Sequence, residues 1–348
     1  MSEPASPFST ALETGRPHQV WVIQPRRRRL WVHIVLLLAT FLSTLVVGER
    51  MQYNFLHSQP VFSLNGDLFL PFVTWIAHPS ELLLGIPFSL TLMFILLAHE
   101  MGHYLYARHY RVYATLPYFV PFPSLIGTLG AFIRIRSPIP SRAALFDIGI
   151  AGPIAGFIPA CVALVAGLSL SHPIAANDAS SIQLGFPLAF HLAARVLHIA
   201  TPLPTLSLHP IAAAAWVGMF ATALNLLPGG QLDGGHIVFS ISPQLHRAIS
   251  FLAVLALIPL GKYFWTGWLL WAVLLAMTVR HPAVPTRPSA LGRRRGIAMV
   301  ALLMLVLAFT PAPFTHSSGR EVWPELRDQG RQGLQSFVDG VRKLLHRN

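Results

Sequence analysis

The sequence predicts an all-α polytopic membrane protein with about seven crossings and a short β-hairpin or strand at the cytoplasmic membrane boundary. Apolar residues make up 53% of the 348 residues and charged residues only 11%, with a mean hydropathy of +0.56, which is too apolar for an ordinary soluble domain. Apolar segments long enough to cross a bilayer recur along the chain. Basic residues fall in the short loops between these segments, as they do in multi-pass membrane proteins.

Five apolar segments each have the length of one crossing, and a sixth is longer. The sixth, residues 248–279, is interrupted by Gly261-Lys262, so we expect two short crossings joined by a tight turn there. A six-helix protein, in which this segment is one helix, is the alternative. The other segments are residues 30–47, 82–107, 143–170, 208–227 and 296–311.

The net charge of +12 is explained by membrane topology rather than by nucleic-acid binding, because the basic residues are spread over short loops. With seven crossings, most of these loops fall on one side, which the positive-inside rule makes cytoplasmic. A single helix over residues 248–279 would place residues 280–295 outside, so the charge pattern favours the hairpin. The basic residues on the cytoplasmic side are Arg26, Arg27, Arg28, Arg29, Arg108, Arg111, Arg134, Arg136, Arg142, Arg280, Arg287, Arg293, Arg294 and Arg295.

Three regions follow from this pattern. Residues 1–29 form a polar, basic cytoplasmic lead, and residues 30–312 form the membrane-embedded domain. Residues 313–348 form an amphipathic tail that lies on the outer membrane surface or docks on a partner. Residues 53–80 are apolar but broken by prolines and a glycine, which predicts a re-entrant or interfacial segment.

A short strand is predicted at residues 131–136, after the glycine-containing stretch Gly127-Thr128-Leu129-Gly130. Its apolar and basic residues alternate, as in a strand with one wet face. The segment is either a plain connector or an edge that pairs with a substrate backbone and holds it extended.

His99-Glu100-Met101-Gly102-His103 lies inside an apolar segment, where ionisable groups are costly and persist mostly where they function. Histidines four residues apart share one helix face and can bind one metal ion. The glutamate between them can take a proton from metal-bound water. The motif therefore predicts a hydrolytic metal site; a pair of packed histidines with a paired glutamate is the structural alternative.

A catalytic zinc needs three protein ligands, so a third must come from elsewhere. Asp233 lies in a stretch where Pro228 and glycines break a helix at membrane depth, which is tolerated only in protein or beside a wet cavity. The topology brings Asp233 and the histidines to the same side of the membrane. His236 could compete for this position, but a packing or supporting role is favoured for it. Asp147 is expected to act structurally, at a helix N-terminus or paired with Arg142.

Small residues recur four apart in Ala151-Gly152-Pro153-Ile154-Ala155-Gly156, and they are expected to let another helix approach closely.

The chain resembles the site-two protease family of intramembrane zinc metalloproteases, in the subgroup without a PDZ domain. His99-Glu100-Met101-Gly102-His103 matches the family's first motif, and residues 225–234, NLLPGGQLDG, match the second. The stretches GTLGAF and ALFDIGIAGPIAGF also resemble this subgroup, which occurs in bacteria, archaea and plastids. The resemblance covers about residues 80–314. It implies that zinc is bound by His99, His103 and Asp233, that Glu100 is the catalytic carboxylate, and that Asn225 lines the site.

The expected function is hydrolysis of peptide bonds in transmembrane segments of membrane-anchored substrates, near the cytoplasmic boundary. Asn225 is expected to donate a hydrogen bond to the developing oxyanion or, alternatively, to tie the broken helix to nearby carbonyls. The expected partners are a transmembrane-helix substrate and the lipid bilayer, without nucleic acid. The expected location is the bacterial inner membrane, as a multi-pass protein. A metal-binding transporter or a non-catalytic membrane chaperone is the rival function.

Overall fold

The computed structural model describes residues 30–62, 80–174, 184–285 and 291–314, and these residues are mostly helical. Four helices are long and apolar enough to cross a membrane: α1 (Leu30–Leu56), α3 (Ile86–His109) with the 3-10 turn η1 (Glu81–Gly85) before it, α4 (Arg142–Ser169) and α8 (Pro243–Tyr263). Three shorter apolar helices are α6 (Pro210–Asn225), α9 (Gly267–Met277) and the Gly296–Ala308 part of α10 (Leu291–Ala308). These seven helices lie at the predicted apolar segments.

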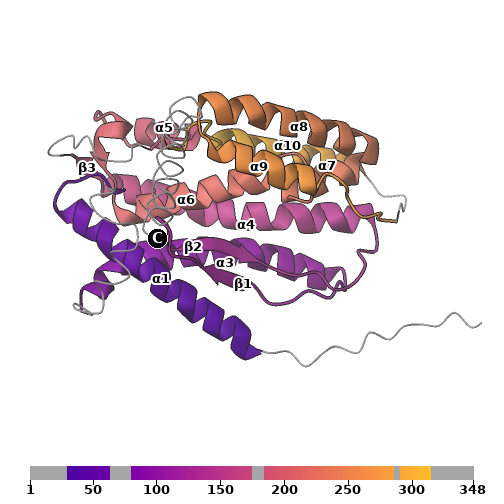
Figure 1. Cartoon of the computed structure of the whole chain (residues 1–348), viewed down its shortest axis with the longest axis horizontal. Helices are drawn as coiled ribbons and strands as arrows, with labels where there is room; N and C mark the ends of the chain where they lie inside the picture. The colour runs from indigo at the N-terminus through magenta and orange to yellow at the C-terminus, as the bar shows by residue number, and fades with distance from the viewer. Residues whose placement is uncertain (1–29, 63–79, 175–183, 286–290, 315–348) are drawn as a thin grey trace, which may run out of the picture.

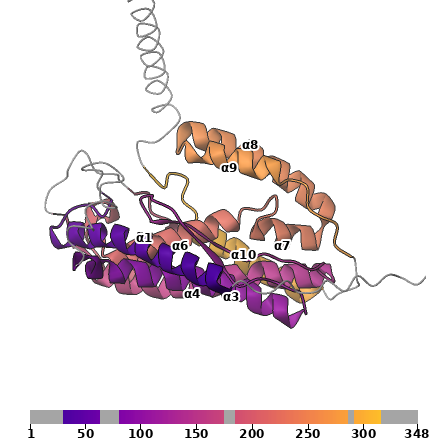
Figure 2. The ribbon, with the colours of Figure 1, turned by 60° about the horizontal axis from the view of Figure 1, so that its bottom comes forward.

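The long apolar segment is divided into two helices, α8 and α9, which lie side by side (Figure 2). The predicted position of the turn is wrong by a few residues, because α8 continues through Gly261 and the chain reverses at residues 264–266. A Cβ on Gly261 would lie 2.5 Å from Leu269 Cγ. Gly261 therefore serves the close approach of the two helices and not the turn between them.

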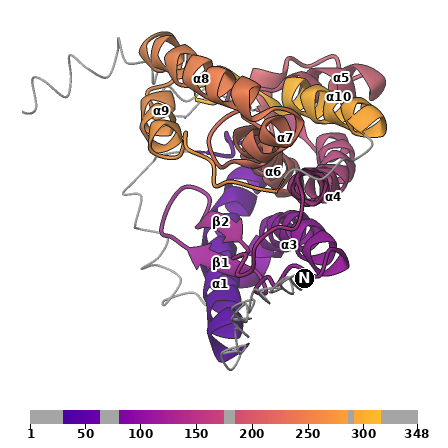
Figure 3. The ribbon, with the colours of Figure 1, turned by 90° about the vertical axis from the view of Figure 1, so that its right-hand side faces the viewer.

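Helices α3, α4 and α6 form the centre of the molecule, and α4 packs against both of the others (Figure 1). Apolar residues of all three helices are fully buried there, among them Phe88, Leu92, Phe146 and Trp216. Viewed end-on, α1 and the first strands lie on one side of this centre and α8 and α9 on the other (Figure 3). The centre is therefore a closely packed core on which a site can be held.

The remaining described elements are short. The helices are α5 (Leu188–Val196), α7 (Asp233–Ile241) and the 3-10 turn η2 (Leu203–Thr205). Strands β3 (His172–Pro173) and β4 (Leu206–Ser207) pair antiparallel beyond the end of α4.

Strands β1 (Tyr118–Pro121) and β2 (Thr128–Phe132) form the predicted hairpin, packed against α1 and α3. The predicted extent of the strand is wrong: β2 begins at Thr128 and ends at Phe132, and pairing resumes only at the Ala114–Ile135 bridge. Gly127 and Gly130 have φ values of +76° and +100°. These glycines belong to the hairpin itself. The alternating residues 131–136 therefore indicate only the later part of the hairpin and leave out the beginning of β2.

Some sequence predictions lie outside the described residues. These are the basic lead at 1–29, most of the proline-broken segment at 53–80, and the amphipathic tail at 313–348 apart from its first two residues.

Candidate metal centre

His99, His103 and Asp233 meet at one point of the structure. The two histidines lie one turn apart on α3 and are buried, and Asp233 is the first residue of α7. Asp233 Oδ2 lies 3.3 Å from Nε2 of each histidine, and the two Nε2 atoms lie 3.2 Å apart. Within the described residues this is the group of side chains that could hold a metal ion.

The triangle of donor atoms has the size that zinc requires. In a tetrahedral site with bonds of about 2.0–2.1 Å, ligand atoms lie about 3.3–3.4 Å from one another. The three distances of 3.2–3.3 Å agree with this edge length. Two imidazoles and one carboxylate are also the donor types of hydrolytic zinc sites, so the residues present fit a zinc ion.

Helix α4 holds the two histidines in place. His103 Nδ1 donates a hydrogen bond of 2.8 Å to the carbonyl of Ile148, which leaves the lone pair of Nε2 free for a metal. A Cβ on Gly152 would lie 2.1 Å from His103 Nε2, and a Cβ on Gly156 would lie 2.9 Å from His99 Cβ. Gly152 and Gly156 therefore have the predicted packing role, and they pack against His103 and His99.

Asp233 reaches the histidines because the chain is broken after α6. This helix ends at Asn225, and α7 begins at Asp233 after an irregular loop that contains Pro228. The loop folds back on α7 so closely that a Cβ on Gly234 would lie 2.2 Å from the carbonyl oxygen of Leu226. The predicted break is confirmed, and its glycines are required by this contact.

Glu100 and Asn225 lie in the same cavity as the metal-binding group. The cavity has a volume of about 250 Å³ and is bordered by α3, β2, α4, the loop after α6, and α7. Glu100 is buried and receives a backbone hydrogen bond from Ile133. Asn225 Nδ2 lies 3.4 Å from His99 Nε2, beside the candidate metal position. One cavity thus brings together a metal-binding group, a carboxylate and an amide.

His236, the competing ligand, is not a member of the metal-binding group. Its Nδ1 is hydrogen-bonded to His281 Nε2 at 2.8 Å, while its ring borders the cavity. This agrees with the supporting role that the sequence left open. His281 was missed by the sequence analysis, because it carries no motif and lies in a polar loop 45 residues away.

Asp147 has a structural role, but the predicted pairing with Arg142 is wrong. Arg294 donates two hydrogen bonds to its carboxylate, from Nε at 3.1 Å and from Nη2 at 2.8 Å, and the Tyr110 hydroxyl donates another. The first turn of α4 contains no acidic residue, and Asp147 lies beyond this turn. The carboxylate therefore ties α10 to the end of α3 instead of stabilising a helix N-terminus.

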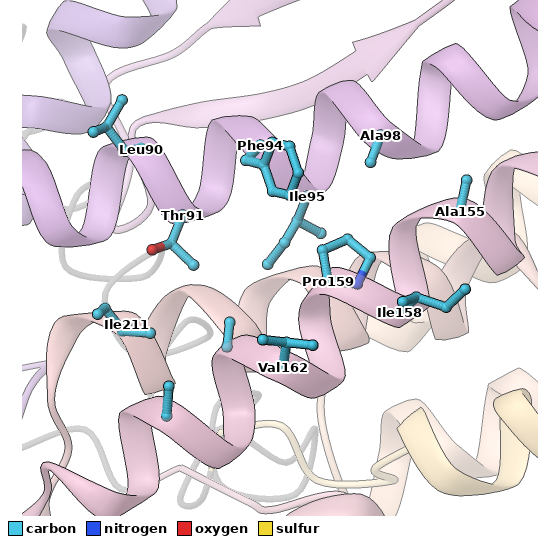
Figure 4. A pocket seen from close by; sticks show the side chains of 12 residues that line it. Leu90, Thr91, Phe94, Ile95, Ala98, Ala155, Ile158, Pro159, Val162 and Ile211 are labelled. Carbon is cyan, nitrogen blue, oxygen red and sulfur yellow. The ribbon is translucent and has the colours of Figure 1, made fainter.

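A second cavity, of about 600 Å³, lies between the other halves of α3 and α4 (Figure 4). Phe94 and Ile95 of α3 lie opposite Pro159 and Val162 of α4, and the lining is almost entirely apolar. Since its side chains offer no metal-binding or acid–base group, this cavity is not a candidate for chemistry.

The comparisons with known proteins agree with this geometry. Residues 87–260 match the model of peptidase family M50. The chain is 30% identical over 338 residues to "Probable zinc metalloprotease EGY1, chloroplastic" of Arabidopsis thaliana, which covers 90% of the chain and 57% of that protein. It is 32% identical over 240 residues to the Arabidopsis "Probable zinc metalloprotease EGY2, chloroplastic", covering 66% of the chain and 43% of that protein. The chain thus spans about half the length of these curated relatives.

Proposed function

The chain belongs to peptidase family M50, the site-two protease family, and on this premise we propose that it is a zinc endopeptidase that hydrolyses peptide bonds in transmembrane segments of membrane-anchored proteins. The observation that carries the proposal is the triangle of His99, His103 and Asp233 with edges of 3.2–3.3 Å, in one cavity with Glu100. A structural cluster of this kind would have no need of the additional carboxylate.

The cavity residues have distinct tasks in this reaction. His99, His103 and Asp233 would hold a zinc ion, which would supply Lewis acidity to a water molecule and to the scissile carbonyl. Glu100 accepts a proton from water and returns it to the leaving amine. Asn225 donates a hydrogen bond to the oxygen on which negative charge develops, an interaction worth about 2.7–4 kcal/mol in comparable sites.

The hairpin supplies partners for an unwound substrate. A transmembrane helix keeps its amide groups in its own hydrogen bonds, so cleavage requires local unwinding. Among the described residues β2 pairs only with β1, and its residues Ala131 and Phe132 border the cavity with Ile133. We propose that the free edge of β2 pairs with the substrate and holds it extended beside Glu100.

The seven apolar helices are proposed to cross the membrane, with the metal centre near the cytoplasmic side. Arg108 lies in the last turn of α3, Arg111 follows this helix, and Arg142 begins α4. The end of this helix pair that holds the histidines is therefore also the basic end. The relatives named above are chloroplast proteins, and the bacterial inner membrane stays a prediction.

Glu100→Gln tests the proposed function in the full-length protein. We expect this variant to retain zinc but to lose cleavage, because it keeps the ligands and lacks the base. The measurement is a proteomic comparison of membranes from cells that produce wild type or Glu100→Gln, in search of fragments that depend on Glu100. The matched control is Glu81→Gln, at the opposite end of the η1–α3 segment.

A transporter needs no general base, so its transport would survive in Glu100→Gln, and a chaperone would likewise keep its activity. If no fragment depends on Glu100, the protease hypothesis is rejected.

A further inference from the structure

The side of the cavity formed by α7 carries a hydrogen-bond acceptor that is not used by the metal-binding group. His236 borders the cavity together with Glu100 and Asp233. Its Nδ1 faces His281, and no described group forms a hydrogen bond with its Nε2. Because Nδ1 is engaged by His281, which does not line the cavity, Nε2 is the ring nitrogen that His236 has left for a substrate.

The neighbouring hydrogen bonds determine which ring nitrogen of His236 carries the proton. His281 Nδ1 lies 2.7 Å from the carbonyl oxygen of Pro282, which can only accept, so Nδ1 is the donor. Burial lowers the pKa of His281, so its ring is neutral near pH 7 and its Nε2 holds a lone pair. This lone pair accepts the hydrogen bond of 2.8 Å from Nδ1–H of His236. The Nε2 of His236 therefore presents a lone pair to the cavity.

An extended substrate needs such an acceptor. A strand has N–H and C=O groups on both edges, and pairing with β2 satisfies only one of them. The other edge faces α7, in a cavity where an unpaired N–H group would be costly. Besides the metal-binding group and Glu100, few polar side chains border the cavity: Asn225, Gln231 and His236. Gln231 already donates its amide to the carbonyl of Arg280.

The spacing on α7 places His236 close to the scissile bond. Residues three apart on a helix have Cβ atoms about 5–6 Å apart, which is the separation expected between Asp233 and His236. A strand advances about 3.3 Å per residue. His236 therefore reaches the backbone one or two residues from the peptide bond that lies at the metal.

We propose that His236, held by His281, is a positioning residue that accepts a hydrogen bond from a substrate main-chain N–H one or two residues from the scissile bond. The proposal rests on the proposed protease function. It divides the recognition of the substrate backbone between β2 on one edge and α7 on the other.

The test uses the purified full-length protein with zinc and a transmembrane peptide that it cleaves. His236→Phe keeps a ring of similar size but lacks the acceptor, and we expect kcat/KM to fall roughly 10-fold to 100-fold. The zinc content should stay unchanged. His236→Gln carries an amide oxygen of similar reach and should recover most of the loss. The matched control is His191→Phe, an exposed position on α5, which should match wild type.

The decisive substrate replaces one backbone N–H with an ester oxygen, at each of the two positions on either side of the scissile bond in turn. At one position wild type should lose about as much as His236→Phe loses on the ordinary peptide, and His236→Phe should lose nothing further. The proposal is overturned if the two losses add at every position, if His236→Phe cleaves like wild type, or if it loses zinc. A failure of the proposed function looks different, because wild type itself would then cleave no peptide in a Glu100-dependent manner.

Discussion

Helices α3 and α4 run side by side, and the two halves of this pair differ in how closely they approach. One half of the pair carries His99 and His103, and we call it the metal half. There Gly152 and Gly156 lie directly on His103 and His99. A Cβ on Gly102 would lie 2.4 Å from the carbonyl oxygen of Ala151. At the other half the helices separate around the apolar cavity of about 600 Å³, where Val162 is 66% exposed (Figure 4).

The difference reflects what each half must hold. Metal ligands have to be placed within a few tenths of an ångström, so the backbone of α4 must approach the imidazoles without intervening side chains. An apolar surface in a bilayer needs only apolar side chains, because lipid can fill the remaining space. The metal half should therefore tolerate almost no added atoms, and the apolar half should tolerate many changes.

The largest effect is expected for Gly152→Ala, which would remove the tight approach at the metal half. Its methyl group would lie 2.1 Å from His103 Nε2, so the imidazole must leave its position. A displacement of about 1 Å in a catalytic group can cost about 100-fold in rate, and we expect at least that loss of cleavage together with a loss of bound zinc. The measurements are peptide cleavage and zinc per chain by elemental analysis.

Gly296→Ala is the matched control, because no atom of the described residues lies within 4 Å of a Cβ at that position. It should bind zinc and cleave like wild type. Full zinc binding by Gly152→Ala would show that the backbone of α4 does not have to approach His103 so closely for the metal to bind.

An intermediate effect is expected when zinc is removed by a chelator. A ligand that binds only the folded state stabilises it by about 2.7 kcal/mol at 100 times its Kd, so the thermal midpoint of the purified protein should fall by several degrees. Asp233→Ala should start from this lower midpoint and should show no further shift with the chelator. An equal shift in both proteins would place the bound metal elsewhere.

The smallest effect is expected for Val162→Ala at the apolar half. Because this side chain is 66% exposed, its truncation should change the free energy of unfolding by only about 0.5 kcal/mol and leave cleavage unchanged. Leu164→Ala, on the same helix, removes a side chain that is only 3% exposed and should cost about 2–5 kcal/mol. Similar losses in the two variants would mean that the apolar cavity is occupied by a tightly packed partner.

Much of the site could be predicted from the sequence because its parts are local. The spacing of His99 and His103 places them on one helix face in any helix. The proline and glycines before Asp233 break a helix wherever they occur. The small residues of α4 likewise indicate a close helix contact without identifying the partner helix. The predicted topology places Asp233 and the two histidines on the same side of the membrane, whereas the distances of 3.2–3.3 Å between their ligand atoms come from the structure.

Other features depended on contacts that no local pattern encodes. The extent of β2 depends on its pairing with β1 and on the positive φ of Gly130 inside the hairpin. The partner of Asp147 is Arg294, 147 residues away, although Arg142 is closer along the chain. His281 acquires its role only by lying against His236.

The sequence by itself determined that the chain is a multi-helix membrane protein, that two of its segments carry candidate metal ligands and a candidate base, and that α4 offers small residues to a neighbour. These properties follow from composition and helical periodicity, which depend on neighbouring residues alone. Only the tertiary structure decided which atoms meet: the ligand triangle, the glycine contacts on the imidazoles, and the histidine pair beside the cavity. Such contacts depend on how the helices pack in three dimensions, and a change of a fraction of an ångström in packing makes or breaks them.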